Sequence, residues 1–281
     1  MLRTRSPVRT LTAVDRDEAL SVCARDLAAN VFVAARIEEG ALDRTPGSVL
    51  GYRDGGELHS LCWVSANLVP VETTAESRLL FAERVRRWRA HCASLLGPQD
   101  QVLDLWHHLE RAWGPERVIR RSQPLMSTRT RPSALGVRLD ARVRPARLDE
   151  VDLVLPAAAH MFTAEIGYAP YTGSPRAYRS AISSLIQRGH TYVIVEDGRV
   201  VFKADVGSVA GGCAQIQGVW LAPDLRGQGL SVAAMASVVE QVMADTAPWV
   251  TLYVNDFNLA ARATYARVGF EDVGMFTTVL L

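Results

Sequence analysis

The chain has 281 residues, which at roughly 150 residues per domain corresponds to about two domains. Hydrophobic residues make up 48% and charged residues 22%, a composition that excludes a mainly disordered chain. No apolar run reaches the roughly 18 residues of a membrane span, and residues 1–20 lack the apolar segment of a secretion signal. We therefore expect a cytoplasmic protein with no membrane partner.

The charges are balanced, with 31 basic and 30 acidic residues and a formal net charge of +1. This balance argues against a dedicated nucleic-acid binder, which carries a strong basic excess. Lys203 is the only lysine among the basic residues. The four cysteines are far apart in sequence and form no C-x-x-C motif, so we expect four free thiols and no metal site.

Helical and extended patterns follow one another in the first half. Apolar residues at helical spacing predict a helical segment over 14–40, which Gly40 would end. Residues 48–71 predict two strands joined by the Asp-Gly-Gly turn at 54–56. Two amphipathic helices are expected at 75–92 and 100–113. The arginines of the first of these spread around the helix, which favours a solvated face over an RNA contact.

Residues 122–136 mix Ser, Thr, Pro and Arg without periodicity, and we predict a linker there. The second half then shows a regular order: strand, two helices, three strands, helix, strand, helix, strand. The expected strands are 137–144, 190–196, 199–206, 213–221, 249–254 and 271–281, and the expected helices are 149–166, 175–188, 230–245 and 257–268.

The first half shows a rougher version of the same order, which indicates a duplicated fold with a degenerate first copy. The predicted domains are therefore 1–121 and 137–281, with the linker 122–136 between them. We expect each to be α/β, with a mixed, mostly antiparallel sheet flanked by helices.

One loop in the second half has the features of a phosphate site. A buried strand ending at Leu221 is followed by a proline-bounded turn, then by Arg226-Gly227-Gln228-Gly229 and the start of a helix. Glycines allow close backbone approach, and the first N–H groups of a helix favour an anion. Arg226 adds a charge-assisted contact. The loop lacks the G-K-[ST] of a Walker motif, and a plain strand-to-helix turn is the alternative interpretation.

A second segment, residues 252–270, supports the interpretation of this loop as a phosphate site. Together the two segments resemble the GCN5-related N-acetyltransferase (GNAT) superfamily. Arg226, Gly229 and Ser231 match its coenzyme A pyrophosphate motif, with Ser231 where Gly or Ala is usual. Its hydroxyl offers an extra contact to phosphate. The second segment contributes Asn258, Ala261, Tyr265 and Gly269-Phe270.

Further runs at 160–167 and 201–204 resemble a bacterial subfamily in which an uncharacterised N-terminal domain precedes the acetyltransferase domain.

The resemblance implies an acetyltransferase-like fold and an acyl-CoA-dependent N-acyltransferase, with acetyl-CoA as cosubstrate and no metal. The acceptor would be an amine on a small molecule or a protein. Tyr265 would be the general acid that protonates the departing thiolate. The implied cofactor-binding residues are Val219, Trp220, Leu221, Arg226, Gly227, Gln228, Gly229, Leu230, Ser231 and Asn258.

The general base stays open at this stage. Many family members place a glutamate on the strand before the loop, where this chain has Gln215 and Gln217. Glu165 is the first candidate, because it lies where the family builds its acceptor site, and Asp205 and Glu196 are the others. Because glutamine cannot accept a proton, Gln215 and Gln217 leave an alternative open: an acyl-CoA-binding sensor without turnover. A third reading, an RNA- or protein-binding scaffold, is disfavoured by the near-neutral charge.

The first half contains no glycine between Gly56 and Gly97. A glycine-free loop is a poor pyrophosphate cradle, so we expect no coenzyme A site in that half. Shaping the acceptor site and mediating a homodimer are the roles left open for it.

Overall fold

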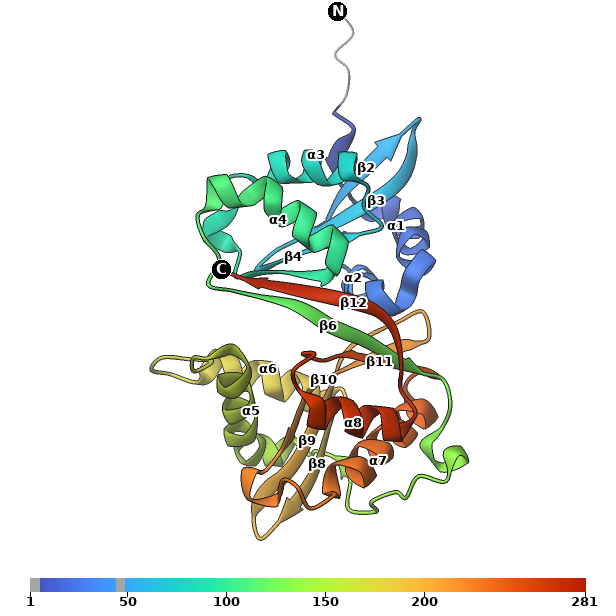
Figure 1. The fold of residues 1–281 in the computed structure, drawn as a ribbon, viewed down its shortest axis with the longest axis vertical. Coiled ribbons are helices and arrows are strands. Elements are labelled where there is room, and N and C mark those ends of the chain that lie inside the picture. Colours follow the sequence, from blue (N-terminus) through green and yellow to red (C-terminus); the bar gives the residue numbers. More distant parts are fainter. Residues whose placement is uncertain (1–5, 44–48) are drawn as a thin grey trace, which may run out of the picture. The chain divides into compact units, whose positions relative to one another are not determined.

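The computed structural model describes residues 6–43 and 49–281, which divide into two compact units. Unit 1 comprises most of the first 125 residues together with 253–257 and 272–281, and unit 2 comprises 126–252 and 258–271. Each unit is a mixed sheet with helices on both faces (Figure 1). The expected fold class, an α/β fold repeated in tandem, is confirmed.

Unit 1 follows the order strand, two helices, three strands, helix, strand, helix, strand. Its elements are β1 (Val8–Thr10), α1 (Arg16–Cys23), α2 (Leu27–Glu38), β2 (Val49–Asp54), β3 (Glu57–Val64), β4 (Asn67–Val71), α3 (Ala75–Val85), β5 (Ser94–Pro98), α4 (Gln99–Trp113) and β6 (Val118–Thr128). In α4, buried apolar residues recur at helical spacing, which is why this helix packs one face on the sheet. Its buried residues are Val102, Leu105, Trp106, Leu109 and Trp113.

Unit 2 repeats this order. Its elements are β7 (Arg144–Pro145), α5 (Val151–Ile166), α6 (Arg176–Gln187), β8 (Thr191–Glu196), β9 (Arg199–Ala210), β10 (Cys213–Leu221), α7 (Leu230–Asp245), β11 (Trp249–Tyr253) and α8 (Leu259–Val268). Helices α5 and α6 pack together over a core that includes Val193 and Val200 of the sheet. Helices α7 and α8 also pack on each other (Figure 1). The strand order within this unit is β11-β10-β9-β8-β7.

The last strand, β12 (Glu271–Leu280), is assigned to unit 1 from residue 272 onward. It pairs antiparallel with β5, with Phe276 opposite Pro98 and Leu280 opposite Ser94. The strand order in unit 1 is therefore β1-β2-β3-β4-β5-β12-β6. The ranges 1–121 and 137–281 expected from the sequence do not include this exchange.

Several sequence-based expectations differ from the structure in detail. The linker expected at 122–136 is wrong for its first part, because β6 continues to Thr128 and a short helical turn covers Pro132–Leu135. The expected strand at 137–144 is reduced to β7. The helix expected at 75–92 ends at Val85, and the segment 48–71 contains three strands instead of two. Ser48 lies outside the described residues.

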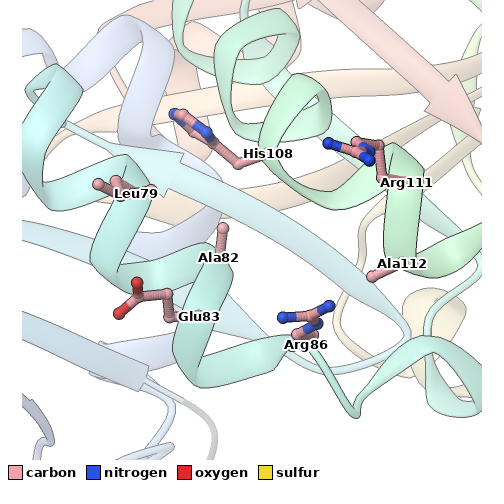
Figure 2. Close-up of a pocket in the computed structure, with 7 residues that line it drawn as sticks. All are labelled: Leu79, Ala82, Glu83, Arg86, His108, Arg111 and Ala112. Carbon is pink, nitrogen blue, oxygen red and sulfur yellow. The ribbon is translucent and has the colours of Figure 1, made fainter.

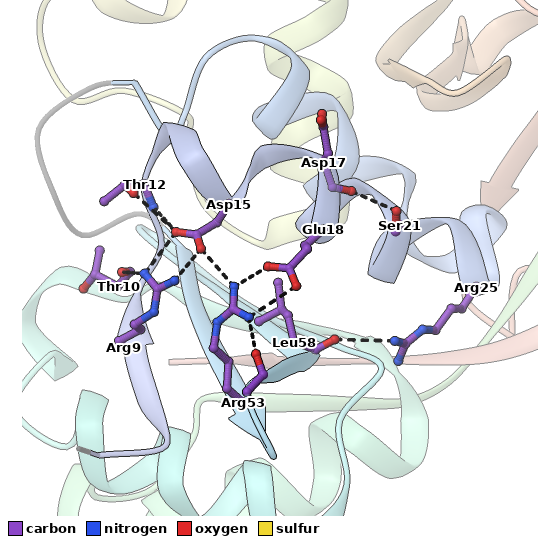
Figure 3. Close-up of polar contacts among 11 residues, drawn as sticks. Arg9, Thr10, Thr12, Asp15, Asp17, Glu18, Ser21, Arg25, Arg53 and Leu58 are labelled. Atoms are coloured by element: carbon purple, nitrogen blue, oxygen red, sulfur yellow. Dashed lines mark hydrogen bonds and ion pairs between the residues drawn. The ribbon is translucent and has the colours of Figure 1, made fainter. Parts of the chain in front are cut away.

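The start of each unit contains the same polar arrangement. In unit 1, Asp15 accepts hydrogen bonds from the Thr12 N–H, at 3.0 Å, and from Arg9 on β1, and it also binds Arg53 (Figure 3). In unit 2, Glu150 accepts from the Arg147 N–H, at 2.8 Å, and from Arg144 on β7, at 2.6 Å.

In both units the arginine precedes the capping position by three residues and the carboxylate by six. This repeated spacing supports the duplication independently of the element order.

This ion pair gives a prediction for stability against pH. The hydrogen bond from Arg144 is the main reason that the pKa of Glu150 falls from 4.5 to about 2. A depressed folded-state pKa contributes stability above the unfolded value, and that contribution is lost as the pH falls from about 4.5 toward 2. Glu150→Gln should therefore cost about 2 kcal/mol at pH 7, after allowance for the solvent around the arginines, and almost nothing near pH 2.

Urea unfolding at pH 7 and pH 3 measures this difference. Asp149→Asn is the control, because Asp149 is 77% exposed and its pair with Arg147 is longer, at 3.5 Å. An equal cost of Glu150→Gln at both pH values would contradict the assignment.

Candidate functional site

The candidate site of unit 2 begins where β10 and β11 separate. The two strands pair in parallel only from Cys213 opposite Trp249 to Gln215 opposite Thr251, although β10 continues to Leu221. On its other side, β10 stays paired with β9 as far as Leu221 opposite Phe202. The edge of β10 that faces β11 is therefore released beyond Gln215. Val219, Trp220 and Leu221, three of the implied cofactor-binding residues, lie on this released edge.

The glycine loop follows directly, between β10 and α7. Gly227 and Gly229 adopt left-handed backbone conformations with φ of +77° and +76°, which side chains rarely adopt. A Cβ built on either glycine would meet no protein atom within 4 Å, so open space lies beside both. Within the described residues, the N–H groups of Gly227, Gln228 and Gly229 donate to no acceptor, and no side chain caps α7. The loop thus presents free amides at a helix start, which suits an anion.

Side chains hold this loop in place. Arg199 on β9 pairs with Asp224 at 2.5 Å, and this hydrogen bond lowers the pKa of the Asp224 carboxyl. The pairing offsets the negative charge of Asp224 at the start of the loop. Gln228 donates to the Asp224 carbonyl at 3.1 Å, and Arg226 donates through Nε to the Leu221 carbonyl at 3.2 Å. Arg226 is exposed, so its guanidinium is accessible to an anion bound at the loop.

Two of the expected cofactor residues also have structural partners. Ser231 lies 3.1 Å from the hydroxyl of Thr264, which itself donates to the Ala260 carbonyl, so the Ser231 hydroxyl donates to Thr264. Its hydroxyl hydrogen is therefore directed at α8, and the extra phosphate contact stays a prediction. Asn258 caps α8, accepting from the Ala261 N–H at 3.2 Å, while the residue itself stays exposed.

Tyr265 on α8 is 7% exposed, and its ring packs on Phe270 with centroids 6.0 Å apart. Burial is the main cause that raises the pKa of its hydroxyl, and the negative charge of Glu165 adds to the increase. Tyr265 therefore stays protonated at neutral pH. No hydrogen bond to its hydroxyl is found within the described residues. The charge of Glu165 on α5 therefore acts on the hydroxyl of Tyr265 on α8.

Four aromatic side chains from α5, α6 and the segment between them pack together. Phe162 contacts Tyr168 and Tyr178, with ring centroids 5.8 and 6.0 Å apart, and Tyr178 contacts Tyr171 at 6.0 Å. We call these four residues the aromatic cluster. Burial first, and then the charges of Asp205, Tyr171 and Glu165, raise the pKa of Tyr178 to about 12. The cluster thus combines ring faces with negative charge, an arrangement that attracts cations.

The other expected residues have different surroundings. The Trp220 indole donates to Nδ1 of His160 on α5 at 3.1 Å, so its side chain is directed toward the α5 face. Asp205 is buried beside Lys203 and accepts from the Thr191 hydroxyl at 2.9 Å. Glu196 forms an ion pair with Arg142 at the end of β8. Among the three candidate bases, only Glu165 interacts with Tyr265.

The corresponding position of unit 1 is filled by its own side chains. The Thr74 hydroxyl caps α3 by accepting from the Ser77 N–H at 3.2 Å, so this helix start is already satisfied. Gln101 of α4 accepts from the hydroxyl and N–H of Thr73, at 2.7 and 3.0 Å. Arg78 joins the same segment to Asp104 at 2.5 Å. These contacts support the expectation that unit 1 has no coenzyme A cradle.

Unit 1 does contain a surface cavity of about 510 Å³ between α3 and α4. Figure 2 shows Arg86 at the end of α3 and Arg111 and His108 on α4 around it. None of the expected site residues lines it. Arg89 lies beyond the end of α3 and donates to the carbonyls of Trp113 and Cys92, so it supports the chain there instead of extending the helix surface.

Two family descriptions match successive parts of the chain. Residues 47–154 match a family described as "Domain of unknown function (DUF4081)", and residues 159–270 match "Acetyltransferase (GNAT) family". A solved structure described as a tandem GNAT protein from the clavulanic acid biosynthesis pathway aligns over 96% of this chain and 97% of its own, with a TM-score of 0.56 and 15% identity.

Two further structures have similar folds. A GCN5-related N-acetyltransferase from Sphaerobacter thermophilus covers 99% of this chain and 96% of its own (TM-score 0.60, 15% identity). A GNAT-family acetyltransferase from Colwellia psychrerythraea covers 98% and 99% (TM-score 0.54, 12% identity). At these identities the likeness is one of fold.

The duplicated strand–helix order and the glycine loop between β10 and α7 thus define an acetyltransferase fold of the tandem type. The chain carries a GNAT acetyltransferase domain, preceded by a DUF4081 domain. No helix in the described ranges is long and apolar enough to cross a membrane. The same ranges contain no group of three or more His, Cys, Asp or Glu side chains placed to hold a metal ion.

Proposed function

We propose that this protein is an acyl-CoA-dependent N-acyltransferase that transfers an acyl group, most readily acetyl, directly to a primary amine. The catalytic domain is the GNAT domain over 137–281, and the N-terminal domain over 1–121 does not bind coenzyme A. The observation that carries the proposal is the loop of unpartnered amides at Gly227–Gly229, which opens beside the released edge of β10.

The backbone of this chain would hold the cosubstrate. The amides from Gly227 to Ser231 and the guanidinium of Arg226 bind the pyrophosphate, because free N–H groups and the helix dipole both favour an anion. The released edge of β10 from Val219 to Leu221 takes the pantetheine arm as an added strand. Asn258 contacts the same arm from the start of α8. Since Trp220 points toward α5, it contributes through its backbone.

The reaction places the attacking amine and the acyl carbonyl together, which supplies much of the rate enhancement. The amine nitrogen forms a bond to the carbonyl carbon, the carbon–sulfur bond breaks, and Tyr265 donates its proton to the departing thiolate. Glu165 accepts the proton that the amine loses, through water. The exposure of Glu165 permits such a water, and the effect of its charge on the Tyr265 hydroxyl supports the pairing of acid and base.

The aromatic cluster indicates the kind of acceptor. An amine reaches the site mostly as a cation, and ring faces beside a carboxylate attract a cation. Phe162, Tyr171 and Tyr178 are partly buried, while Tyr168 is 49% exposed, so the cluster opens to solvent on one side. We therefore assign to this site an alkyl ammonium acceptor, either a small molecule or an amine on a protein.

A binding module without turnover is the second candidate. Gln215 and Gln217 favour it, since neither can act as a base on β10. Gln215 is buried in the ladder and the Gln217 side chain packs over Gly207. Turnover separates the two functions, because a sensor binds acyl-CoA and leaves it intact.

The test is calorimetric titration of the full chain with acetyl-CoA. We expect saturable binding that Gly229→Glu weakens at least about 100-fold, because the new carboxylate enters the anion site and strains the loop. Gly198→Glu is the matched control: Gly198 has a φ of +72° and equally open surroundings, but lies in the β8–β9 turn. The control should bind normally.

Failure of the wild-type protein to bind acetyl-CoA would exclude both functions. Binding without acyl transfer to any alkylamine of a screened set would favour the binding module.

A further inference from the structure

We propose that Lys203, the only lysine of the chain, is a positioning residue for acyl transfer. Its ammonium group, held by Asp205, fixes the Gly218–Val219 peptide so that the Val219 N–H is directed at the acyl-CoA. This inference rests on the proposed function, and it adds a residue of β9 that lies outside the glycine loop.

The peptide in question lies in a β-bulge. Between the pairs Gln217–Asp205 and Trp220–Lys203, two residues of β10 lie opposite Ala204 alone. Gly218 has a φ of +59°, which a glycine adopts readily. The bulge follows the point where β10 leaves β11, so it lies at the start of the released edge.

Lys203 holds the carbonyl side of this peptide. Its Nζ donates to the Gly218 carbonyl at 3.2 Å and forms an ion pair with Asp205. The Lys203 side chain is 1% exposed, and the second oxygen of Asp205 accepts from the Thr191 hydroxyl at 2.9 Å. A buried ammonium needs such partners, because desolvation of an unpaired charge is costly.

The direction of the amide follows from covalent geometry. A trans peptide is planar, with its C=O and N–H pointing in opposite directions. Because the Gly218 carbonyl points at Lys203, the Val219 N–H points away from it. Among the described residues, this N–H has no hydrogen-bond acceptor outside the strand pairing. Within the pairing of β10 with β9, Val219 has no partner residue. A donor fixed in this way stabilises developing negative charge on an acyl oxygen without reorganisation.

Arginine would not serve here, although 30 of the 31 basic residues of this chain are arginines. A Cβ built on Gly218 would already lie 3.1 Å from the lysine Nζ and 3.0 Å from Asp205, so the space is full. Met161 of α5 closes the remaining side at 3.2 Å. The compact ammonium fits, and the broader guanidinium does not.

A stability effect must be separated from a positioning effect. Lys203→Met alone would leave Asp205 buried without its partner, and the cost of that unpaired charge would destabilise the fold by itself. The double variant Lys203→Met/Asp205→Asn carries no buried charge, and its asparagine can still accept from Thr191. It removes the donor to the Gly218 carbonyl. Arg144→Met/Glu150→Gln is the matched control, as it neutralises another ion pair of unit 2.

Hydrogen–deuterium exchange with and without acetyl-CoA provides a readout that does not depend on turnover. In the wild type, acetyl-CoA should slow exchange in peptides covering 216–221 and 227–231. In the Lys203/Asp205 double variant, protection of 227–231 should remain, while protection of 216–221 is lost. The acyl-transfer kcat should fall at least tenfold, with the Kd for acetyl-CoA changed less than about threefold. The control should behave as the wild type.

The outcomes are distinguishable. Protection of neither segment in the wild type would overturn the proposed function and this inference together. Protection of both segments in the double variant, with a kcat within twofold of the wild type, would overturn the role of Lys203 alone.

Discussion

Tyr265→Phe should lower kcat for acyl transfer by about 10²–10⁴-fold, because it removes the proton donor for the thiolate and leaves the ring in place. The raised pKa of Tyr265 keeps the hydroxyl protonated through neutral and moderately alkaline pH, so the wild-type rate should not decline there through loss of this acid. Steady-state kinetics with acetyl-CoA and an alkylamine, followed by thiol release, measure the change.

The control for this variant is its own stability and binding. The Tyr265 hydroxyl makes no hydrogen bond within the described residues, so its removal should change the free energy of unfolding by less than about 1 kcal/mol. The Kd for acetyl-CoA should also stay the same. A Tyr265→Phe enzyme with full kcat would exclude Tyr265 as the general acid.

Glu165→Gln should lower kcat/KM for an alkylamine by about 10²-fold near pH 7, where the amine must lose a proton in the site. The defect should shrink as the pH approaches the amine pKa near 10, because more of the acceptor then arrives without that proton. The same variant removes a negative charge that acts on Tyr178 of the aromatic cluster, so the KM for cationic amines should also increase.

Rates of wild type and variant across pH 7 to 10 check this result. Glu83→Gln is the matched control, because Glu83 is an exposed glutamate at the unit 1 cavity. A rate defect of Glu165→Gln that stays constant with pH would contradict a role as proton acceptor and leave only the electrostatic one.

Local chemistry made much of the candidate site predictable. The glycines at 227 and 229 indicated a loop with positive φ before a helix, and α7 does begin at Leu230. Tyr265 and Glu165 were expected from the family resemblance, and the charge of Glu165 acts on the Tyr265 hydroxyl, while their catalytic roles stay predictions. The helix at 230–245 was predictable to the residue, since its pattern is long and its start is marked by glycine.

What escaped prediction depends on contacts distant in sequence. Lys203 and Asp205 of β9 meet Gly218 of β10 at a β-bulge. The position of a bulge depends on how two strands pair, and no local sequence pattern shows that pairing. The extended segment 122–128 lacks apolar periodicity, because polar residues of β6 such as Gln123 bond to Thr278 and Asn255, far along the chain. The repeated arginine and carboxylate at 9 and 15, and at 144 and 150, were visible as a spacing, but only their hydrogen bonds explain why it recurs.

The position of β12 has a consequence for synthesis. Unit 1 receives the strand between β5 and β6 from residues 272–280, which leave the ribosome more than 140 residues after β6. Until then, β5 exposes a free edge, and unpaired edges promote association with other chains. The first domain therefore cannot complete its sheet co-translationally, and expression of residues 1–121 alone should yield an aggregation-prone fragment. Adding residues 271–281 as a separate peptide would be the direct way to restore it.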